Sequence, residues 1–515
     1  MPRAFNTAGP CRAEDHYMLP PTARLPQVMG LVGQKLYFVL HAPRQTGKTT
    51  ALLGLAEELT ASGRYVAALL SMEVGAPFGD DPGAAEGAIL GSWSRAAGAQ
   101  LPQELQPPPW PAAEPGDGIG AALAAWAVAA PRPLVVFLDE IDALHDAALI
   151  SVLRQLRDGY RNRPRAFPWS LALIGLRDVR DYRVAAGEAG RLGTASPFNI
   201  KVESITLRNF DAAEVAALYR QHTEDTGQLF TPEALERAFV LTQGQPWLVN
   251  ALARQAVEVL VTDRAAPVTA EVIEAAKDLL IARQDTHLDS LAERLREERV
   301  RRVIEPILAG GAAGQDLPED DIRYAVDLGL VHWNGGLEIA NPIYGEIIPR
   351  VLATAARAYL PRLDPVWLRA DGRMDAGRLL EAFLQFWRQH GEPLMRGLPY
   401  AEVAPHLVLM AFLDRVRNGG GSLEREYAVG SGRMDLCLRY GPDTFAFELK
   451  VWREGRPDPV TDGLAQLDRY LLGLGLGTGW LVIFDRRTGQ PPIEDRTSAV
   501  EAMTPAGRTV TVVRA

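Results

Sequence analysis

The 515-residue chain is too long for one hydrophobic core, so its length predicts three or four domains. A content of 47% hydrophobic and 23% charged residues is typical of a soluble globular protein, and the net charge of −10 excludes one that coats nucleic acid by bulk electrostatics. The longest nearly apolar stretch, 119–130, is about half the length of a membrane-spanning helix, and the first residues contain no apolar signal region. We therefore expect a cytoplasmic protein with no membrane partner, in which Cys11 and Cys437 are reduced thiols.

The N-terminal part alternates apolar runs with helical patterns. Residues 36–41 form an apolar run, and the spacing of residues 50–59 is helical. Further buried strands are predicted at 65–70, 134–138 and 169–174. This alternation predicts an α/β parallel sheet covered by helices on both faces. The segment 75–117, rich in Pro, Gly and Ala, is predicted to be an irregular insertion.

The segment between the first strand and the first helix has the composition of a phosphate-binding loop. Backbone amides of residues 43–48 would surround the phosphates of ATP, Lys48 would bridge the terminal phosphates, and the Thr49 hydroxyl would hold Mg²⁺. Ala42 replaces the first glycine of the usual pattern. The predicted nucleotide-binding residues here are Pro43, Arg44, Gln45, Thr46, Gly47, Lys48, Thr49 and Thr50.

The predicted strand at 134–138 is followed by two acids. Together with the phosphate-binding loop, these acids would complete an ATPase site. Asp139 is predicted to lie beside the metal, and Glu140 to orient or deprotonate the attacking water. The alternative is a strand followed by an acidic helix cap. Arg177 follows the fourth strand and is predicted to approach the terminal phosphate, while Pro246 could close over the base. A surface arginine and a plain helix break are the alternatives for these two residues.

The middle of the chain is helical. Residues 211–278 predict a helical lid, and residues 292–360 predict helices and a hairpin around 334–336, which suggests a winged helix. The predicted domains are an ATPase core at 1–207, a lid at 208–280, a winged helix at 281–360 and a second α/β domain at 361–515.

The last domain contains a second set of candidate catalytic residues. Two strand-like runs, 432–439 and 444–450, predict an antiparallel hairpin in which Glu448 and Lys450 point to one face. Asp435, on the other strand, could share a hard cation, Mg²⁺ or Mn²⁺, with Glu448 and the Leu449 carbonyl. Lys450 would then stabilise the attacking hydroxide, and Gln466, on the following helix, could position the nucleophile or a phosphate. The alternative is a surface hairpin that merely carries Glu and Lys.

Lysine is rare in this chain. Of 54 basic residues only five are lysines, namely Lys35, Lys48, Lys201, Lys277 and Lys450. Because a compact ammonium at a phosphate or a water nucleophile is not replaced by a planar guanidinium, the retention of Lys48 and Lys450 favours a role in chemistry for both.

Two resemblances follow from these motifs. The blocks at 5–12, 41–50, 196–199 and 244–247 resemble the AAA-like prokaryotic ATPases related to the STAND class over roughly residues 1–355. That resemblance implies ATP binding, a lid and a winged helix, with Arg177 sensing phosphate and Pro246 in the lid motif.

The second resemblance covers the last domain. Residues 395–490, with Gly432-Arg433 before Asp435 and Tyr470 one turn after Gln466, resemble PD-(D/E)XK restriction-type nucleases. This implies catalytic roles for Asp435, Glu448 and Lys450 and leaves the first-helix acid open between Glu402 and Glu426.

The combined expectation is an ATP-controlled, Mg²⁺-dependent nuclease of DNA or RNA, by family analogy in prokaryotic nucleic-acid defence. The rivals are an ATP-dependent DNA-binding switch with an inactive nuclease fold and a signalling scaffold that oligomerises. An arginine-rich segment, 154–191, predicts an interface in a homo-oligomer, with a nucleic-acid contact or a solvated face as alternatives.

Overall fold

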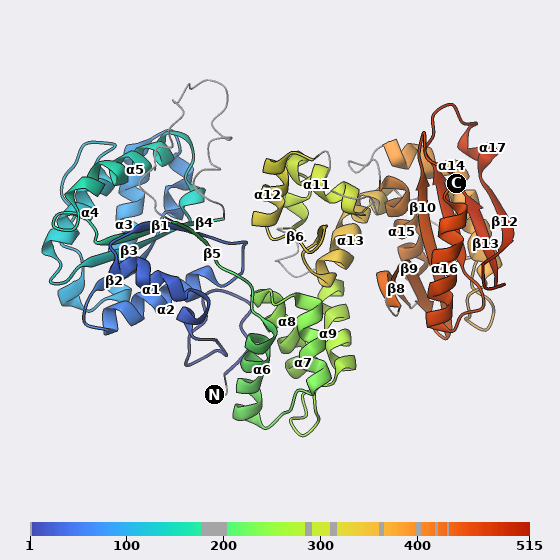
Figure 1. Cartoon of the computed structure of the whole chain (residues 1–515), viewed down its shortest axis with the longest axis horizontal. Helices are drawn as coiled ribbons and strands as arrows, with labels where there is room; N and C mark the ends of the chain where they lie inside the picture. Colours follow the sequence, from blue (N-terminus) through green and yellow to red (C-terminus); the bar gives the residue numbers. More distant parts are fainter. Residues whose placement is uncertain are drawn as a thin grey trace. The chain divides into compact units, whose positions relative to one another are not determined.

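A computed structural model describes residues 3–176, 203–283, 291–308, 317–359, 365–396, 403–417, 421–429 and 432–515. Its contacts divide the chain into two compact units. The first contains residues 1–280 and 326–329, and the second contains 281–325 and 330–515. Figure 1 labels most elements of the two units, which are described separately below.

The first unit is built on a five-stranded parallel sheet, as predicted. The strand order is β2-β3-β4-β1-β5, which places β4 between β1 and β3. The four predicted strands are confirmed, and β5 is an additional strand that the sequence pattern did not reveal. The strands are β1 (Tyr37–His41), β2 (Val66–Ser71), β3 (Leu134–Asp139), β4 (Ser170–Gly175) and β5 (Glu203–Thr206).

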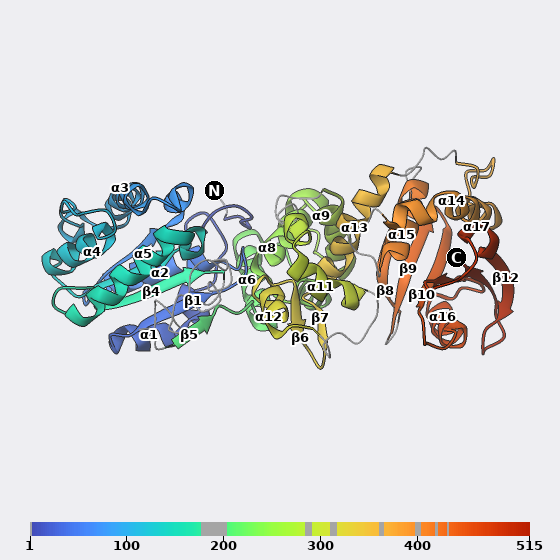
Figure 2. The same ribbon diagram turned by 90° about the horizontal axis from the view of Figure 1, so that it is seen from above.

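Helices cover both faces of this sheet because the strands are apolar on both sides (Figure 2). Val39, Val136 and Leu171 face one side and pack under α3, α4 and α5, whereas Phe38 and Phe137 face the other side under α1 and α2. The helices are α1 (Pro26–Gly33), α2 (Lys48–Ala61), α3 (Pro82–Gln100), α4 (Gly118–Ala129) and α5 (Asp146–Gly159).

The prediction of an irregular insertion at 75–117 is wrong. This segment contains most of a 3-10 helix (Glu73–Phe78), all of the 19-residue helix α3 and a 3-10 turn (Gln103–Leu105). Pro82 occupies the first turn of α3, where proline starts a helix, and Asp81 caps it by accepting from the Ala84 amide at 3.0 Å. Ile89 and Trp93, one turn apart, are fully buried under the sheet, so the alanines between them support a helix.

The segment predicted as a helical lid is helical, and its role as a lid remains a prediction. Asp211 and Glu214 form a reciprocal capping box at the start of α6, and Gly227 ends that helix with a left-handed backbone. The lid helices are α6 (Ala212–Thr226), α7 (Pro232–Thr242), α8 (Pro246–Gln255), a π-helical turn (Ala256–Leu260) and α9 (Ala270–Arg283).

The second unit begins with helices and a small hairpin in the predicted order. These are α11 (Glu298–Leu308), α12 (Glu319–Asp327), the antiparallel pair β6 (Val331–Trp333) and β7 (Leu337–Ile339), and α13 (Pro342–Tyr359). The hairpin turns at 334–336, as predicted; the winged-helix assignment remains a prediction.

A six-stranded mixed sheet forms the rest of the second unit, in the order β12-β13-β11-β10-β9-β8. Helix α16 covers one face, where Cys437 and Ala446 pack with Leu467, and α14 and α15 cover the other, where Trp387 lies against Phe484 (Figure 2). The strands are β8 (Ser422–Val429), β9 (Gly432–Tyr440), β10 (Asp443–Trp452), β11 (Trp480–Asp485), β12 (Ser498–Met503) and β13 (Thr509–Arg514). The helices are α14 (Ala376–Arg396), α15 (Ala404–Arg417), α16 (Val460–Leu474) and α17 (Ile493–Arg496).

Helix α13 packs on the six-stranded part of the unit through α15 and β8. The Arg350 guanidinium donates to the Leu423 carbonyl at 2.6 Å. A cut at the predicted boundary, between 360 and 361, would therefore remove a helix from the domain that it covers. Among the described residues, no helix combines the length and apolar content that crossing a bilayer requires.

Candidate functional site

The phosphate-binding loop lies where the sequence places it, between β1 and α2. Gly47 has a φ of 81° and immediately precedes α2, and Gln45 also has a positive φ of 59°. Thr46 is buried, and its hydroxyl donates to the Pro43 carbonyl at 2.9 Å, which closes the loop on itself. These left-handed residues turn backbone amides toward the start of the helix, the arrangement that binds anions.

Lys48 lies inside this loop. Its ammonium donates to the carbonyls of Ala42 at 2.6 Å and Pro43 at 2.8 Å. An ammonium has three donors, so it can serve a further acceptor such as a phosphate oxygen. Burial lowers the pKa of Lys48 to about 8, an effect that Asp139 opposes.

The predicted metal residues of the first unit are brought together. The Thr49 hydroxyl donates to Asp139 Oδ2 at 3.1 Å, and the Glu140 amide donates to Asp139 Oδ1 at 3.0 Å. Asp139 is 5% exposed, and burial raises its pKa. A hydroxyl and a carboxylate beside a phosphate loop are oxygen ligands suited to Mg²⁺.

Glu140 has an acidic partner that sequence reasoning missed. Burial and a hydrogen bond to Glu73 raise the pKa of Glu140 to about 7. Glu73 follows β2, and the adjacent Met72 amide donates to the Asp139 carbonyl at 2.9 Å, so the neighbouring strands β2 and β3 bring the two acids together. The signal available in the sequence was an acid two residues after the end of a buried strand.

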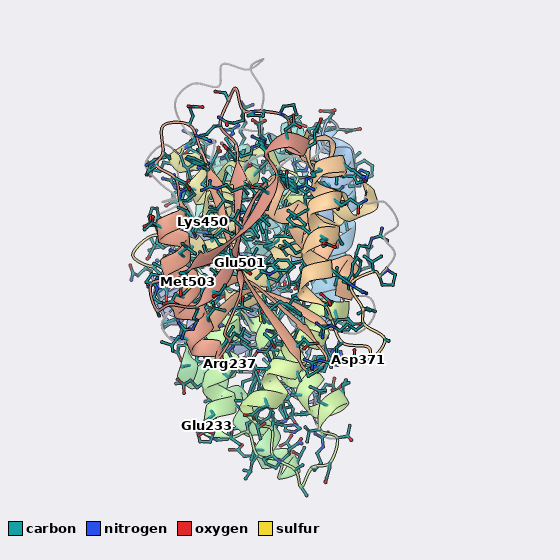
Figure 3. All side chains as sticks on the ribbon, turned by 90° about the vertical axis from the view of Figure 1, so that its right-hand side faces the viewer. Glu233, Arg237, Asp371, Lys450, Glu501 and Met503 are labelled. Carbon is teal, nitrogen blue, oxygen red and sulfur yellow. The ribbon has the colours of Figure 1, made fainter. Side chains whose placement is uncertain are left out.

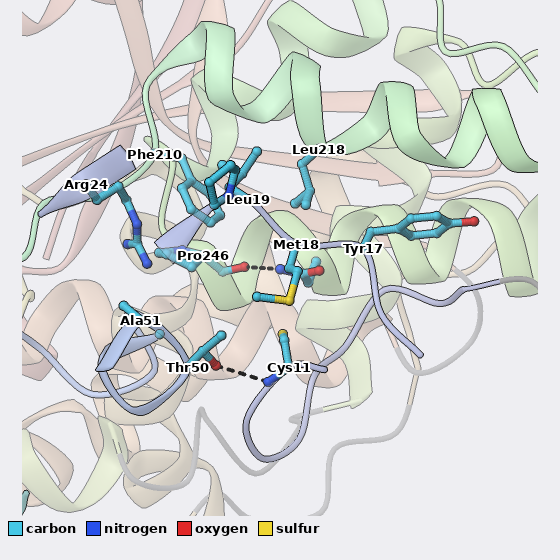
Figure 4. A pocket seen from close by; sticks show the side chains of 13 residues that line it. Cys11, Tyr17, Met18, Leu19, Arg24, Thr50, Ala51, Phe210, Leu218 and Pro246 are labelled. Carbon is cyan, nitrogen blue, oxygen red and sulfur yellow. Dashed lines mark hydrogen bonds between the residues drawn. The ribbon is translucent and has the colours of Figure 1, made fainter. Parts of the chain in front are cut away.

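A pocket opens beside the first turn of α2, with about 460 Å³ of empty space when the part open to solvent is included. In Figure 4, Thr50 and Ala51 lie on one side of it, and Phe210, Leu19 and Leu218 lie on the other. The lining residues come from the N-terminal segment, the phosphate loop, α2 and the lid: Cys11, Tyr17, Met18, Leu19, Pro20, Arg24, Gly47, Thr50, Ala51, Phe210, Leu218, Pro246 and Asn250.

Arg24, which the sequence analysis did not single out, contacts both the phosphate loop and the segment at Arg208 and Phe210 that leads into the lid. Its guanidinium donates to the carbonyls of Thr46 at 2.9 Å and Arg208 at 3.0 Å and lies 4.7 Å from the centre of the Phe210 ring. Burial lowers the pKa of Arg24 to about 10. One arginine therefore contacts both the predicted phosphate-binding loop and the segment that leads into the lid.

The turn that contains Pro246 contacts the predicted phosphate loop, and the role of Pro246 at the base remains a prediction. Gly244 has a φ of 69°, and a Cβ there would meet the Phe210 carbonyl oxygen at 1.8 Å. Gln245 caps α8 by accepting from the Leu248 amide at 2.6 Å and donates to the Gln45 carbonyl at 3.5 Å. The Gly244-Gln245-Pro246 turn is thus held against both the loop and the pocket.

The N-terminal segment, residues 3–20, fastens the lid to the core. Arg3 pairs with Asp225 of α6 at 3.0 Å, and Gln221 exchanges two hydrogen bonds with the Met18 backbone. At the core, the Cys11 amide donates to the Thr50 hydroxyl at 3.0 Å, a contact drawn in Figure 4. The pocket is therefore enclosed by residues from three separate parts of the sequence.

The second candidate site lies on β9 and β10 in the other unit. Cys437 and Ala446 pack against α16, so the residues two positions away on each strand, Asp435 and Glu448, lie on the same face. The backbone pairing of β9 with β10 ends at Phe447 and Leu436. Beyond it, the Asp435 carboxylate accepts from the Leu449 amide at 2.7 Å. The strands thus separate at the two acids.

Glu448 and Lys450 form an ion pair in which the carboxylate is buried and the lysine side chain is partly exposed. Lys450 Nζ lies 2.5 Å from Glu448 Oε1, and Glu448 is 2% exposed. Burial raises the pKa of Glu448 to about 8, with a further contribution from Asp435 that Lys450 opposes. Figure 3 labels Lys450 on this sheet, together with Glu501 and Met503 on the edge strand β12.

Two buried oxygen atoms of the predicted site residues have no hydrogen-bond partner within the described parts of the chain. They are Oε2 of Glu448 and Oε1 of Gln466, which comes from α16, as predicted. Buried acceptors without partners are costly in free energy, and a hard cation beside Glu448 Oε2 would satisfy that oxygen. The described residues therefore fit a bound Mg²⁺ or Mn²⁺ ion.

Some predicted residues cannot be placed. Arg177 and Glu402 lie outside the described residues, as does the side chain of Glu426. Within the described residues, no group of three or more His, Cys, Asp or Glu side chains is arranged to hold a metal. Asp435 and Glu448 are two carboxylates, and any third acid of the site remains a prediction.

The strand order, the loop between β1 and α2 and the acid that ends β3 define the first unit as a P-loop ATPase fold. Solved structures similar to the chain include the Walker-type ATPase PABY2304 of Pyrococcus abyssi, with 13% identity over 67% of this chain and 99% of that one and a TM-score of 0.46. The RuvB Holliday junction branch migration motor of Thermotoga maritima matches with 15% identity over 61% and 91% and a TM-score of 0.33.

A third similar structure is Cdc6p of Pyrobaculum aerophilum, with 10% identity over 80% of this chain and 98% of that one and a TM-score of 0.37. At these identities and TM-scores, none of the three likenesses says what this chain does. No protein-family model matches the chain, and no curated protein matches it.

Proposed function

We propose that this protein is an ATP-controlled, metal-dependent nuclease of DNA or RNA. The observation that carries the nuclease assignment is the buried Glu448, which has one oxygen on Lys450 at 2.5 Å and the other without a partner among the described residues. A surface hairpin would leave the Glu448 carboxylate in water, whereas here it is buried on the sheet face that α16 covers. An acid in this environment suits a cation ligand better than a structural role.

The residues suggest a division of roles at this site. Asp435, Glu448 and the Leu449 carbonyl would hold Mg²⁺ or Mn²⁺, which when bound supplies a water of lowered pKa and neutralises charge on the phosphodiester. Lys450 places a positive charge beside the same carboxylate, where it can stabilise the attacking hydroxide. Gln466 offers an oxygen that can accept a hydrogen bond from the attacking water and so position it.

In the first unit we propose that ATP and Mg²⁺ bind at the phosphate loop. The amides of 43–48 and the Lys48 ammonium would hold the phosphates, and Thr49 and Asp139 would hold the ion. The base would enter the pocket between the N-terminal segment and the lid, against Pro246. Glu140, whose pKa of about 7 lies near neutrality, would accept a proton from the attacking water at or above that pH.

The setting in which the protein acts is also a proposal. Exposed arginines on α5 and the turn after it, Arg154, Arg157, Arg161 and Arg165, support an interface in a cytoplasmic homo-oligomer. A role in prokaryotic nucleic-acid defence rests on the resemblance of the motifs alone.

The test is cleavage by the full chain. Plasmid, single-stranded DNA and tRNA are incubated with the protein and Mg²⁺ or Mn²⁺, with and without ATP, beside a Glu448→Gln variant. We expect metal-dependent cleavage of at least one substrate that Glu448→Gln lowers by about a hundredfold or more. Nucleic-acid binding without cleavage under every condition would favour the ATP-dependent binding switch instead.

A further inference from the structure

The nucleotide pocket contains a buried acceptor whose role the proposed function does not explain. Asn250, on α8, lines the pocket and is 6% exposed. Its Oδ1 atom has no hydrogen-bond partner within the described residues. Because buried polar atoms are nearly always paired in native proteins, this oxygen marks a position where a ligand can donate a hydrogen bond.

The orientation of this amide is fixed by its other end. Asn250 Nδ2 donates to the Pro246 carbonyl at 2.8 Å, the contact drawn at Pro246 in Figure 4. A carbonyl oxygen can only accept, so rotating the amide by 180° would place two acceptors against each other. Oδ1 therefore faces away from Pro246 as an acceptor, and the group that it recognises must be a donor.

The position of Asn250 indicates which part of a nucleotide it meets. The phosphates belong at the first turn of α2, beside Gly47 and Thr50, whereas Asn250 belongs to the lid with Leu218 and Pro246. Phe210, Met18 and Leu19 add apolar surface suited to a flat base. Oδ1 is thus placed to meet the base and not the phosphates.

We propose that Asn250 selects adenine over guanine by accepting a hydrogen bond from the 6-amino group of the base. Adenine has an amino donor at position 6, and guanine has a carbonyl acceptor there. Guanine would place its oxygen against Oδ1, and both acceptors would stay unpaired. This inference rests on the proposed binding of a nucleoside triphosphate at the phosphate loop.

The experiment compares triphosphates that differ at position 6. Binding of ATP, inosine triphosphate and purine riboside triphosphate to the full chain is measured by competition against a fluorescent ATP analogue. We expect purine riboside triphosphate, which lacks the amino group, to bind about tenfold more weakly than ATP. Inosine triphosphate, which has a 6-oxo group, should bind more weakly still, because its acceptor faces Oδ1.

Two variants then test whether the preference for ATP over the two analogues depends on Asn250. Asn250→Leu keeps a similar side-chain volume without the acceptor, so it should bind all three triphosphates within about threefold of one another. Gln255→Leu is the matched control: Gln255 is a second buried amide of α8, 7% exposed, that does not line the pocket. This control should keep the preference for ATP. If Asn250→Leu does not fold, the analogue series on the unmodified chain decides the question.

The outcomes separate this inference from the proposed function. Equal binding of the three triphosphates by the unmodified chain would overturn the selection of adenine and leave ATP binding standing. If 2′- or 3′-deoxy-ATP binds more weakly than ATP while the group at position 6 has no effect, the donor to Asn250 Oδ1 belongs to the ribose. That result would also overturn the selection of adenine. A folded protein that binds no triphosphate would overturn the proposed function itself.

Discussion

The four described lysines each have a specific environment, although basic residues in this chain are mostly arginine. Lys48 lies in the predicted phosphate loop, and Lys450 pairs with Glu448, which the sequence places on the same face of the strand. Lys35 lies 4.5 Å from the centre of the Trp169 ring, and the buried Lys277 lies 3.3 Å from Asp278. A retained lysine therefore marks a constrained position, but the scarcity of lysine alone does not separate chemistry from packing.

The first prediction tests the ammonium at Lys450. Lys450→Arg keeps the charge, but a planar guanidinium is bulkier and cannot present a point charge to the same oxygen. We expect cleavage to fall almost as far as in Lys450→Ala, by about a hundredfold or more, while ATP hydrolysis stays unchanged. Both rates are measured on the same preparations. Cleavage by Lys450→Arg at the full rate would make this lysine a structural residue.

The second prediction concerns pH and metal at Glu448. The pKa of Glu448 in the folded chain is about 8, above its ordinary value of 4.5, so folding favours the protonated form. This contribution to stability is fully present below pH 4.5 and is lost as the pH rises toward 8. Without divalent metal, the melting temperature should fall over that range more in the unmodified protein than in Glu448→Gln, which is neutral throughout.

Metal should reverse this loss. At pH 8, Mg²⁺ or Mn²⁺ binds the ionised carboxylates and should raise the melting temperature of the unmodified protein by a few degrees. Glu448→Gln should show little of this gain, and EDTA should abolish it. A metal response that is equal in both proteins would place the cation elsewhere.

At the scale of elements, the turn between α7 and α8 holds the lid in position. The Phe210 amide donates to the Gly244 carbonyl at 2.9 Å, and the space beside the Gly244 α-carbon is filled by the Phe210 carbonyl. Only glycine allows the backbone of the lid motif to approach the start of the lid so closely. This contact fixes Pro246 and Asn250 relative to the pocket.

The third prediction compares two glycines of the lid. Gly244→Ala would force a Cβ to 1.8 Å from a backbone oxygen, so the turn must move, and ATP binding should be lost or weakened by more than about tenfold. Gly227→Ala is the control, because Gly227 also has a positive φ, 78°, but nothing lies within 4 Å of its Cβ position. It should cost about 1 kcal/mol of stability and leave ATP binding intact.

Calorimetric binding of ATP and thermal unfolding distinguish the two variants. If Gly244→Ala bound ATP as tightly as Gly227→Ala, the close approach of this turn to Phe210 would not control the pocket.

At the scale of the whole molecule, the nucleotide site and the carboxylate–lysine site belong to different compact units. The proposed function requires that the state of one changes the activity of the other, which is a coupling free energy between two sites. Substitutions at the first site therefore test whether ATP binding or ATP hydrolysis controls cleavage.

The fourth prediction is that ATP binding activates cleavage. Lys48→Ala removes the ammonium that bridges the phosphates and should abolish both ATP binding and ATP-stimulated cleavage. Glu140→Gln removes the group that handles water, so it should bind ATP, hydrolyse it slowly and cleave at least as fast as the unmodified protein. Cleavage is measured at saturating ATP. If Glu140→Gln were as inactive as Lys48→Ala, hydrolysis would be the controlling step.

The sequence alone determined the features that depend on local pattern. Apolar runs and their spacing predicted four strands of the first sheet and the hairpin of β9 and β10, because side-chain alternation and helical period are local properties. The loop around Lys48 and the acids at Asp139 and Glu140 could be assigned roles because their chemistry depends on position relative to one strand or helix. The helix α3 was missed because its alanines and prolines were interpreted as loop composition.

The tertiary structure decided which distant segments complete each site. Glu73 meets Glu140 because β2 lies next to β3, and Arg24 reaches the phosphate loop from a segment that shows no motif. The burial of Glu448 depends on α16 packing over the sheet, and the unpaired oxygen of Asn250 depends on how one lid helix faces a pocket. Burial and the loss of hydrogen-bond partners are set by all neighbouring elements together, so no local sequence pattern can reveal them.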